Sequence, residues 1–258
     1  MTYLAKNYNR KKIAFKYGKG SYLYSRDNKK YLDFVQGIAV NSLGHAHPKL
    51  VKTINEQSKK LWHVSNAFQI PEGEKLAKKL CQKTFANFVM FQNSGAEATE
   101  AAIKVARRYF YSIGKKNKNI ILCVKNSFHG RTLAAIYASG SKKMTEGFGP
   151  KVSGFNHFTF GDHKTLMKKI TKRTAAIMVE PIMGEGGIKV IPDWCLKELR
   201  NHFINLPIDP RNRVEKLLKK TGCWNVLWKE KNLPLTEKQE EGLPFQANNK
   251  MVGVNESI

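Results

Sequence analysis

Continuous apolar stretches alternate with amphipathic segments through the middle of the chain, and this order constrains the fold more than any other feature. The strand-like stretches lie at 88–92, 119–125, 155–160 and 175–179. Helix patterns follow them at 95–111, 130–139, 162–171 and 192–203. Strands that are apolar throughout are typical of parallel sheets covered on both faces, and helices commonly connect such strands. The order predicts an α/β fold with a mainly parallel sheet.

The first 70 residues have a different pattern. Two β-rich runs, at 21–25 and 30–34, are separated by Arg-Asp-Asn-Lys, which predicts a hairpin. The stretch 37–48 is rich in glycine and favours a loop. Pro48 begins a helix pattern that continues to about Trp62, and Pro71 begins another. The regular alternation of strand and helix starts only after these segments.

The charge of the chain raises the question of a nucleic-acid partner, because the 258 residues carry a formal net charge of +25. The lysines are spread along the whole chain, and the densest patches, at 8–12 and 114–119, are typical of solvated turns. A nucleic-acid binder would need clustered Lys and Arg with interleaved aromatic residues, which the sequence does not show. We therefore expect no nucleic-acid partner.

Membrane and metal sites are not expected either. No apolar run approaches the roughly 18 residues that a membrane-spanning helix needs. The four cysteines are far apart and form no CxxC pair, which favours a reducing cytoplasm. His45 and His47 have no third ligand at metal-binding spacing.

Three motifs could carry chemistry, and the first is Ser94-Gly95-Ala96, at the junction of a strand-like stretch and a helix pattern. Free amides at a helix start, together with the helix dipole, favour an anion such as phosphate. The alternative is an ordinary capped helix, in which Ser94 caps and Glu97 completes a capping box. The spacing alone leaves both interpretations open.

The second motif, at 125–132, follows a strand at the edge where open α/β folds usually bind ligands. Phe128 could stack on a planar ring, and Arg131 could bind a carboxylate. The alternative is a turn with a packed Phe and a solvated Arg.

The third motif, at 179–188, is a glycine-rich loop that carries Glu185 and follows a buried strand. It is neither a Walker A loop nor a GxGxxG fingerprint, so a flexible crossover loop is the alternative.

Taken together in this order, "SGAEATEAAIKVARRY", "FHGRT" and "VEPIMGEGG" resemble the class III (subgroup II) pyridoxal-phosphate-dependent aminotransferases. "DFVQGIAVNSLGHAHP" and "LWHVSNAF" are similar to the acetylornithine aminotransferases within that class. The resemblance covers residues 1 to about 203. It implies a fold-type I transferase with a truncated large domain and a mainly parallel sheet, pyridoxal 5'-phosphate as cofactor, and a cytoplasmic homodimer with active sites at the subunit interface.

The resemblance also implies roles for particular residues. Ser94, Gly95 and Ala96 would hold the cofactor phosphate, and Phe128 would stack on the pyridine ring. The substrate-binding residues would be Arg131, for the α-carboxylate, and the loop residue Glu185, for gating the substrate site. Met183 departs from the glutamine that is usual before Gly-Glu-Gly-Gly in the family.

Two groups that the family requires are not found, namely the Schiff-base lysine and the aspartate that pairs with the pyridine nitrogen. Both would follow the position of Phe203. In the tail, Asp209 lies in a turn-like segment, and no lysine follows a buried strand. We therefore expect an N-terminal segment at 1–48, a partial cofactor-binding domain at 49–203 and an unmatched tail at 204–258. A frameshift, a gene-boundary error or a fused segment would each produce such a tail.

The expected activity of the intact enzyme is amino-group exchange between N-acetylornithine and 2-oxoglutarate, a step of arginine biosynthesis. Without its lysine and aspartate, this chain is expected not to catalyse the reaction. Succinyldiaminopimelate and ornithine stay open as alternative substrates. A non-catalytic fragment, or a partner subunit of a full-length aminotransferase, is the alternative function.

Overall fold

A computed structural model of the chain describes residues 3–84, 86 and 88–204, and these residues belong to two compact units. Unit 1 ends at Ser65, and unit 2 begins at Asn66. Asp209 and the rest of the expected tail from 205 on lie outside the described residues. No helix among the described residues has both the length and the apolar character that a membrane span requires.

Unit 1 contains a three-stranded antiparallel sheet, made of β1 (Phe15–Lys19), β2 (Tyr22–Ser25) and β3 (Lys30–Leu32). Strands β2 and β3 pair as predicted for a hairpin, with Tyr22 opposite Leu32. The stretch after the sheet is mostly turns. All four residues of its short helix α1 (Gln36–Ala39) have positive φ, which agrees with the predicted loop. Helix α2 (Pro48–Gln57) begins at the predicted proline but ends earlier than predicted.

A polar network holds the end of the sheet to the loop that follows. Asp33 accepts hydrogen bonds from the amides of Val35 and Gln36, and its second oxygen lies 2.7 Å from His45 Nε2. His45 also pairs through its backbone with Gly20. The first histidine of the His-Ala-His sequence therefore has a structural role in unit 1.

The core of unit 2 is a parallel sheet with the strand order β5–β4–β6. Its strands are β4 (Ile120–Val124), β5 (Phe155–Phe158) and β6 (Thr174–Met178). Both pairings with β4 are parallel, as the apolar stretches predicted. The central strand β4 is almost completely buried, which explains why its sequence is apolar throughout.

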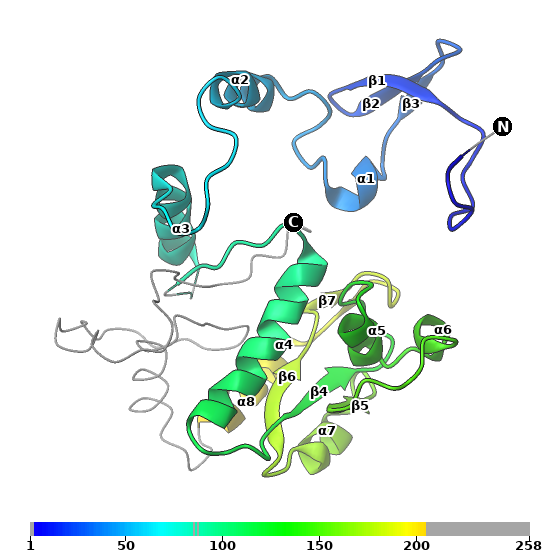
Figure 1. The fold of residues 1–258 in the computed structure, drawn as a ribbon. Helices are drawn as coiled ribbons and strands as arrows, with labels where there is room; N and C mark the ends of the chain where they lie inside the picture. Colours follow the sequence, from blue (N-terminus) through cyan, green and yellow to red (C-terminus); the bar gives the residue numbers. More distant parts are fainter. Residues whose placement is uncertain (1–2, 85, 87, 205–258) are drawn as a thin grey trace. The chain divides into compact units, whose positions relative to one another are not determined.

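Helices cover both faces of this sheet. In Figure 1, α4 (Gly95–Ser112) crosses in front of the sheet and α8 (Asp193–Ile204) lies behind it. Ile121 and Cys123 of β4 pack with Ile103 of α4, whereas the alternate residues Leu122 and Val124 pack with residues of the opposite layer. The remaining helices of unit 2 are α3 (Pro71–Lys83), α5 (Leu133–Ser139), α6 (Lys142–Thr145) and α7 (His163–Lys169). The fold is a three-layer α/β/α arrangement in this part of the chain.

One prediction about local structure was wrong, and one small element was not predicted. The apolar stretch 88–92 is not a strand, and only Met90 has a single bridge. A strand needs a partner along its length, and the sheet of the described residues ends at β5 and β6. The glycine-rich loop after β6 contains an unpredicted two-stranded hairpin, β7 (Ile182–Met183) and β8 (Lys189–Val190), too short for a periodic pattern.

Candidate functional site

The N-terminus of α4 presents free backbone donors. Ser94 is the N-cap residue, and its hydroxyl oxygen accepts a hydrogen bond from the amide of Glu97 at 3.2 Å. The Glu97 carboxylate in turn accepts from the amide of Asn93 at 2.7 Å. Within the described residues, the amides of Gly95 and Ala96 have no acceptor. The helix is therefore capped, as one interpretation required, and still offers two donors to an anion.

The loop that contains Phe128 and Arg131 lies against this helix end. Gly130 has a φ of +113°, and a Cβ atom placed on it would lie 2.9 Å from the Cβ and 3.0 Å from the Cα of Ala96. Real side chains do not approach so closely. A glycine is needed here because the backbone of the loop runs directly over the first turn of α4.

The third motif is tied to the second by a carboxylate. Glu180 Oε1 accepts a hydrogen bond from the backbone amide of Phe128 at 2.7 Å, across 52 residues of sequence. The amide of Gly184 donates to the same carboxylate. Further along, a Cβ atom on Gly186 would lie 3.4 Å from the carbonyl oxygen of Asn126. Three motifs that are far apart in sequence therefore meet in one place.

The environment of Glu180 affects its ionisation. Burial raises the pKa of Glu180 above its ordinary value, the amides of Phe128 and Gly184 oppose this, and the nearby carboxylate of Glu185 adds to the increase. The two backbone donors stabilise the charged form, which a half-buried carboxylate would otherwise disfavour. Glu180 therefore joins the two loops at some cost in desolvation.

A second polar pair lies beside Phe128. Ser127 is buried, and its hydroxyl donates to the carbonyl oxygen of Val124 at 2.7 Å. Because that proton is used, the 2.9 Å contact between Ser127 Oγ and His129 Nε2 requires His129 to carry its proton on Nε2. Burial, with a smaller contribution from His157, lowers the pKa of His129 to about 4. His129 is neutral at pH 7 and orients the loop.

The predicted substrate-binding side chains lie at the exposed rim of this region. The Arg131 guanidinium lies over the ring of the partly buried Phe128, with its Cζ 5.6 Å from the ring centroid. Arg131 and Glu185 are both exposed. The structure thus brings Ser94, Gly95, Ala96 and the Phe128 loop together, and places the loop of Glu185 beside them.

Sequence reasoning assigned no role to Glu180 or Ser127, although both lie within the predicted motifs. Their position after a buried strand was the only available indication. Met183, where the family usually has glutamine, is 2% exposed and packs in the apolar core with residues of β4 and α8. Its side chain contributes to packing rather than to a polar contact.

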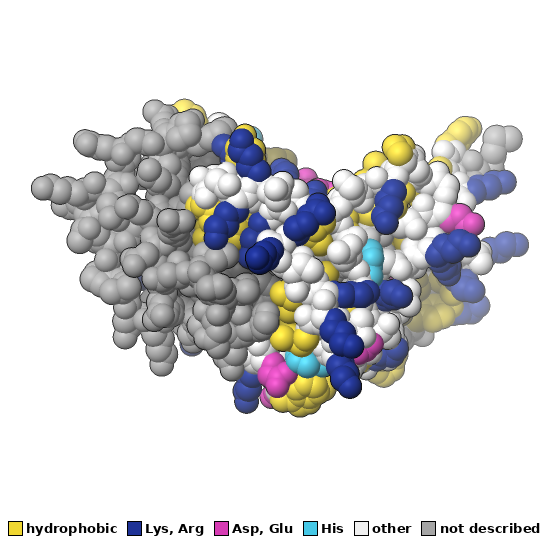
Figure 2. Space-filling model, turned by 90° about the horizontal axis from the view of Figure 1, so that it is seen from below, with side chains coloured by type: hydrophobic (Ala, Val, Ile, Leu, Met, Phe, Trp, Pro, Cys, Tyr) yellow, Lys and Arg dark blue, Asp and Glu magenta, His cyan; other side chains and the backbone are white. Residues whose placement is uncertain are grey.

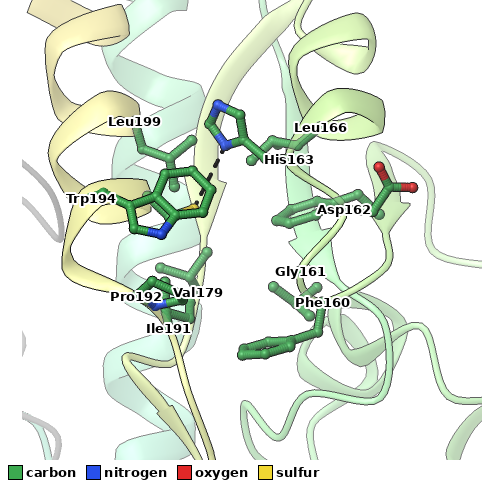
Figure 3. A pocket seen from close by; sticks show the side chains of 13 residues that line it. Phe160, Gly161, Asp162, His163, Leu166, Val179, Ile191, Pro192, Trp194 and Leu199 are labelled. Carbon is green, nitrogen blue, oxygen red and sulfur yellow. Dashed lines mark hydrogen bonds between the residues drawn. The ribbon is translucent and has the colours of Figure 1, made fainter.

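A separate apolar cavity lies between α7, α8 and the ends of β4 and β5 (Figure 3). His163 lies at its edge, with Nε2 2.6 Å from Glu198 and Nδ1 3.7 Å from Cys195 Sγ. The volume of the cavity, about 40 Å³, is far below the roughly 300 Å³ of a small-molecule site. None of the predicted site residues lines it, and no group of three metal-ligating side chains occurs among the described residues.

Comparison with known protein families shows which family the chain resembles. The family described as Aminotransferase class-III matches residues 3–203. Acetylornithine aminotransferase from Brucella melitensis is 51% identical over 193 residues, which cover 75% of this chain and 48% of that protein. The protein of the same name from Aquifex aeolicus is 46% identical over 201 residues, covering 78% of this chain and 53% of that protein. The chain spans about half the length of the curated relatives it matches.

Solved structures agree with the fold. Ornithine aminotransferase from Toxoplasma gondii superposes with a TM-score of 0.71 at 27% identity, covering 86% of this chain and 53% of that chain. N-acetylornithine aminotransferase from Stenotrophomonas maltophilia gives a TM-score of 0.61 at 32% identity, covering 75% and 48%. The architecture is that of the fold-type I pyridoxal-phosphate-dependent aminotransferases, as the motifs predicted.

Proposed function

The chain belongs to the class-III aminotransferase family, whose members depend on pyridoxal phosphate, and from this membership we propose that its three motifs form the cofactor half of an aminotransferase site. The observation that carries the proposal is the approach of Gly130 to Ala96, which brings the Phe128 loop over the start of α4.

The phosphate of the cofactor would bind at the start of α4. The amides of Gly95 and Ala96 would donate to it, with the Ser94 hydroxyl beside them. These three residues are only partly buried, so an anion could reach them. A side chain on Gly130 would collide with Ala96, so the glycine is what lets the Phe128 loop lie beside these donors.

The ring of the cofactor would stack on Phe128. The hydrogen bond from the Phe128 amide to Glu180 and the neighbouring Ser127–His129 pair fix this segment of backbone. When bound, pyridoxal phosphate supplies an electron sink for reactions at the α-carbon of an amino acid. Arg131 would bind the substrate α-carboxylate by a bidentate contact, and Glu185 would gate the substrate site.

We propose N-acetylornithine and 2-oxoglutarate as the substrates of the assembled enzyme, a step of arginine biosynthesis in the cytoplasm. Relatives with about half of the aligned residues identical are named acetylornithine aminotransferase. These names support N-acetylornithine over succinyldiaminopimelate as the substrate. Ornithine is the closest alternative, because an ornithine aminotransferase shares the fold.

We expect the 258-residue chain to bind the cofactor without turnover. The family match ends at residue 203, and no lysine or aspartate in the positions that the family uses was found in the sequence. The residues assigned to the half-site, namely Ser94, Gly95, Ala96, Phe128, Arg131 and Glu185, include no lysine.

An assembled form with another chain is the second part of the proposal, either a homodimer or a pairing with a full-length aminotransferase. The supporting observation is the apolar surface of unit 1. Phe34, Ile38 and Trp62 are 79% to 89% exposed, and no apolar side chain of residues 3–65 is buried. Apolar surface of this extent is typical of protein interfaces.

The test is cofactor binding by the variant Gly130→Val, measured by fluorescence titration with pyridoxal phosphate. We expect at least a tenfold weaker affinity, because the new side chain would collide with Ala96. The control is Gly147→Val, since Gly147 also has a positive φ but nothing within 4 Å of its Cβ position. Equal losses of cofactor affinity in both variants would contradict the proposed phosphate site.

Turnover is measured separately, with N-acetylornithine and 2-oxoglutarate. Turnover by the chain alone would contradict the expected inactivity. Co-purification of the chain with a full-length aminotransferase would support pairing with that subunit.

A further inference from the structure

The end of α4 that points away from the proposed cofactor site carries a cluster of cations and aromatic rings. We call Arg108, Tyr111, Lys115, Lys116 and Lys118 the α4 basic patch. Tyr111 is 52% exposed, and two cations lie over its ring, with Arg108 Cζ at 5.3 Å and Lys116 Nζ at 5.2 Å from the ring centroid. Lys118 Nζ lies 4.6 Å from the centroid of the Phe110 ring. The stretch 108–118 therefore contains the cations with neighbouring aromatic residues that the expectation of no nucleic-acid partner overlooked.

Acidic side chains do not balance this patch. No Asp or Glu occurs between Glu100 and Glu146. Within the described part of the chain, none of the patch cations forms an ion pair. Figure 2 shows one face of the molecule, on which Lys and Arg side chains are spread more widely than acidic ones.

Further cations lie at the same end of the sheet. The amide of Ile120 donates to the carbonyl oxygen of Arg173. This hydrogen bond places the exposed Arg173 beside the start of β4. Arg107 donates to the carbonyl oxygen of Ser153 at 2.9 Å, just before β5 begins. The amino ends of the three parallel strands therefore share a positively charged edge, opposite the carboxyl ends where the three motifs meet.

The helix dipole alone does not explain so many cations. The C-terminus of a helix carries about half a negative charge, which favours a nearby cation. The summed positive charge of Arg108, Lys115 and Lys116 is several times larger than this partial negative charge. Lys118 is 7% exposed, and burial, with repulsion from Lys115, lowers its pKa. An anion bound here would relieve this repulsion.

We propose that the α4 basic patch binds single-stranded nucleic acid. The exposed ring of Tyr111 between two cations matches the combination that such ligands use, in which phosphates contact Lys and Arg while bases stack on aromatic or guanidinium planes. A duplex would need a surface that fits a groove, whereas a single strand needs only this alternation of charge and ring. The patch is remote from the cofactor half-site, so the binding is independent of the proposed aminotransferase function.

The test uses the 258-residue chain and a fluorescein-labelled oligouridylate, with affinity measured by fluorescence anisotropy at 50 and 200 mM KCl. Contacts from three cations predict a slope of about −2 in a plot of log affinity against log salt, or about a 15-fold weaker affinity at the higher salt. The triple variant Arg108→Gln, Lys115→Gln, Lys116→Gln should lose at least tenfold in affinity at 50 mM KCl and most of this slope.

The matched control removes the same charge from α3 through Lys75→Gln, Lys78→Gln and Lys79→Gln, all exposed lysines. It should change the affinity less than twofold. Tyr111→Ala should weaken binding at least fivefold, while Tyr111→Phe, which keeps the ring, should not. An unchanged circular dichroism spectrum in all variants confirms that they are folded.

Three outcomes would overturn the proposal. They are the absence of salt-dependent binding by the unmodified chain, equal losses in the two triple variants, and equally effective competition by polyglutamate at matched charge. The last would show that the patch recognises an acidic polypeptide as well as a nucleic acid. A labelled oligodeoxythymidylate of the same length distinguishes RNA from DNA as the preferred strand.

Discussion

Units 1 and 2 differ in what their interiors contain. Unit 2 buries the residues of β4 between two layers of helices, with Leu122 and Cys123 fully inaccessible to solvent. In unit 1, the buried side chains among residues 3–65 are Ser25 and Asp33, and both are polar. One unit is stabilised by an apolar core, and the other by short strands and hydrogen bonds.

This difference indicates which part is stable within the chain itself. Burial of apolar surface is the dominant favourable term in folding, and short antiparallel strands without an apolar face are marginal in water. Unit 2 has the core that an independent domain requires. We expect unit 1 to gain stability when another surface covers its apolar side chains, as in the proposed assembly.

The largest expected effect comes from the core of unit 2. Leu122→Ala should lower the free energy of unfolding by about 3–5 kcal/mol, because it leaves a cavity between two packed layers. Ile54→Ala in unit 1 should change it by less than about 0.5 kcal/mol, because Ile54 is 66% exposed. Urea denaturation followed by circular dichroism measures both. A comparable loss for Ile54→Ala would mean that unit 1 is already covered in the isolated chain.

The second prediction concerns pH and the site in unit 2. The pKa of His129 is lowered to about 4 in the folded state, so the unfolded chain binds this proton more readily. Stability should fall as the pH drops from about 6.5 to about 4, by up to roughly 3 kcal/mol from this group.

His129→Gln should remove that part of the pH dependence, measured as the difference in unfolding free energy between pH 7 and pH 5. His63→Gln, at an exposed position of unit 1, is the control and should leave it unchanged. An unaltered pH profile in His129→Gln would show that other groups cause the dependence.

The third prediction concerns the cap of α4. Ser94→Ala should cost about 1 kcal/mol, because the amide of Glu97 loses its acceptor. It should also weaken pyridoxal phosphate binding severalfold, as Ser94 lies beside the proposed phosphate position. Ser42→Ala, an exposed serine in unit 1, should have no effect on either measurement. Loss of stability with unchanged cofactor affinity would leave Ser94 as a cap alone.

The smallest expected effect lies in the polar network of unit 1. Backbone hydrogen bonds from Gln36 and the contact with His45 lower the pKa of Asp33. The contribution of the Asp33 carboxylate to the free energy of unfolding is therefore complete above the ordinary pKa of an aspartate. This contribution is lost as the pH falls through the lower pKa of the folded state. His45→Gln should accelerate hydrogen exchange at Val35 and Gln36 severalfold, without changing exchange in β4. Exchange that rises in both units would contradict their separate stabilisation.

The sequence was a good guide wherever structure depends on neighbours in the chain. The bounds of α4, β4 and β6 were predicted within a residue or two, because apolar periodicity and the Ser94 cap act over a few positions. The stretch 88–92 failed as a strand because a strand also needs a partner, which local pattern does not supply.

The same limit applies to the site. Ser94, Phe128 and Glu185 could be selected as motif residues, but their roles stay predictions that the cofactor titration has to test. Glu180 could not be selected, because its partner, the Phe128 amide, is 52 residues away. No periodicity in a single sequence encodes such a contact.

The sequence by itself determined the α/β class, the family and the three motifs, because these follow from patterns within short segments. Only the tertiary structure decided that Gly130 passes over Ala96 and that Glu180 ties two loops together. Those contacts join residues that become neighbours only when the strands and helices pack. Packing in three dimensions, rather than order along the chain, sets the shape of the proposed cofactor site.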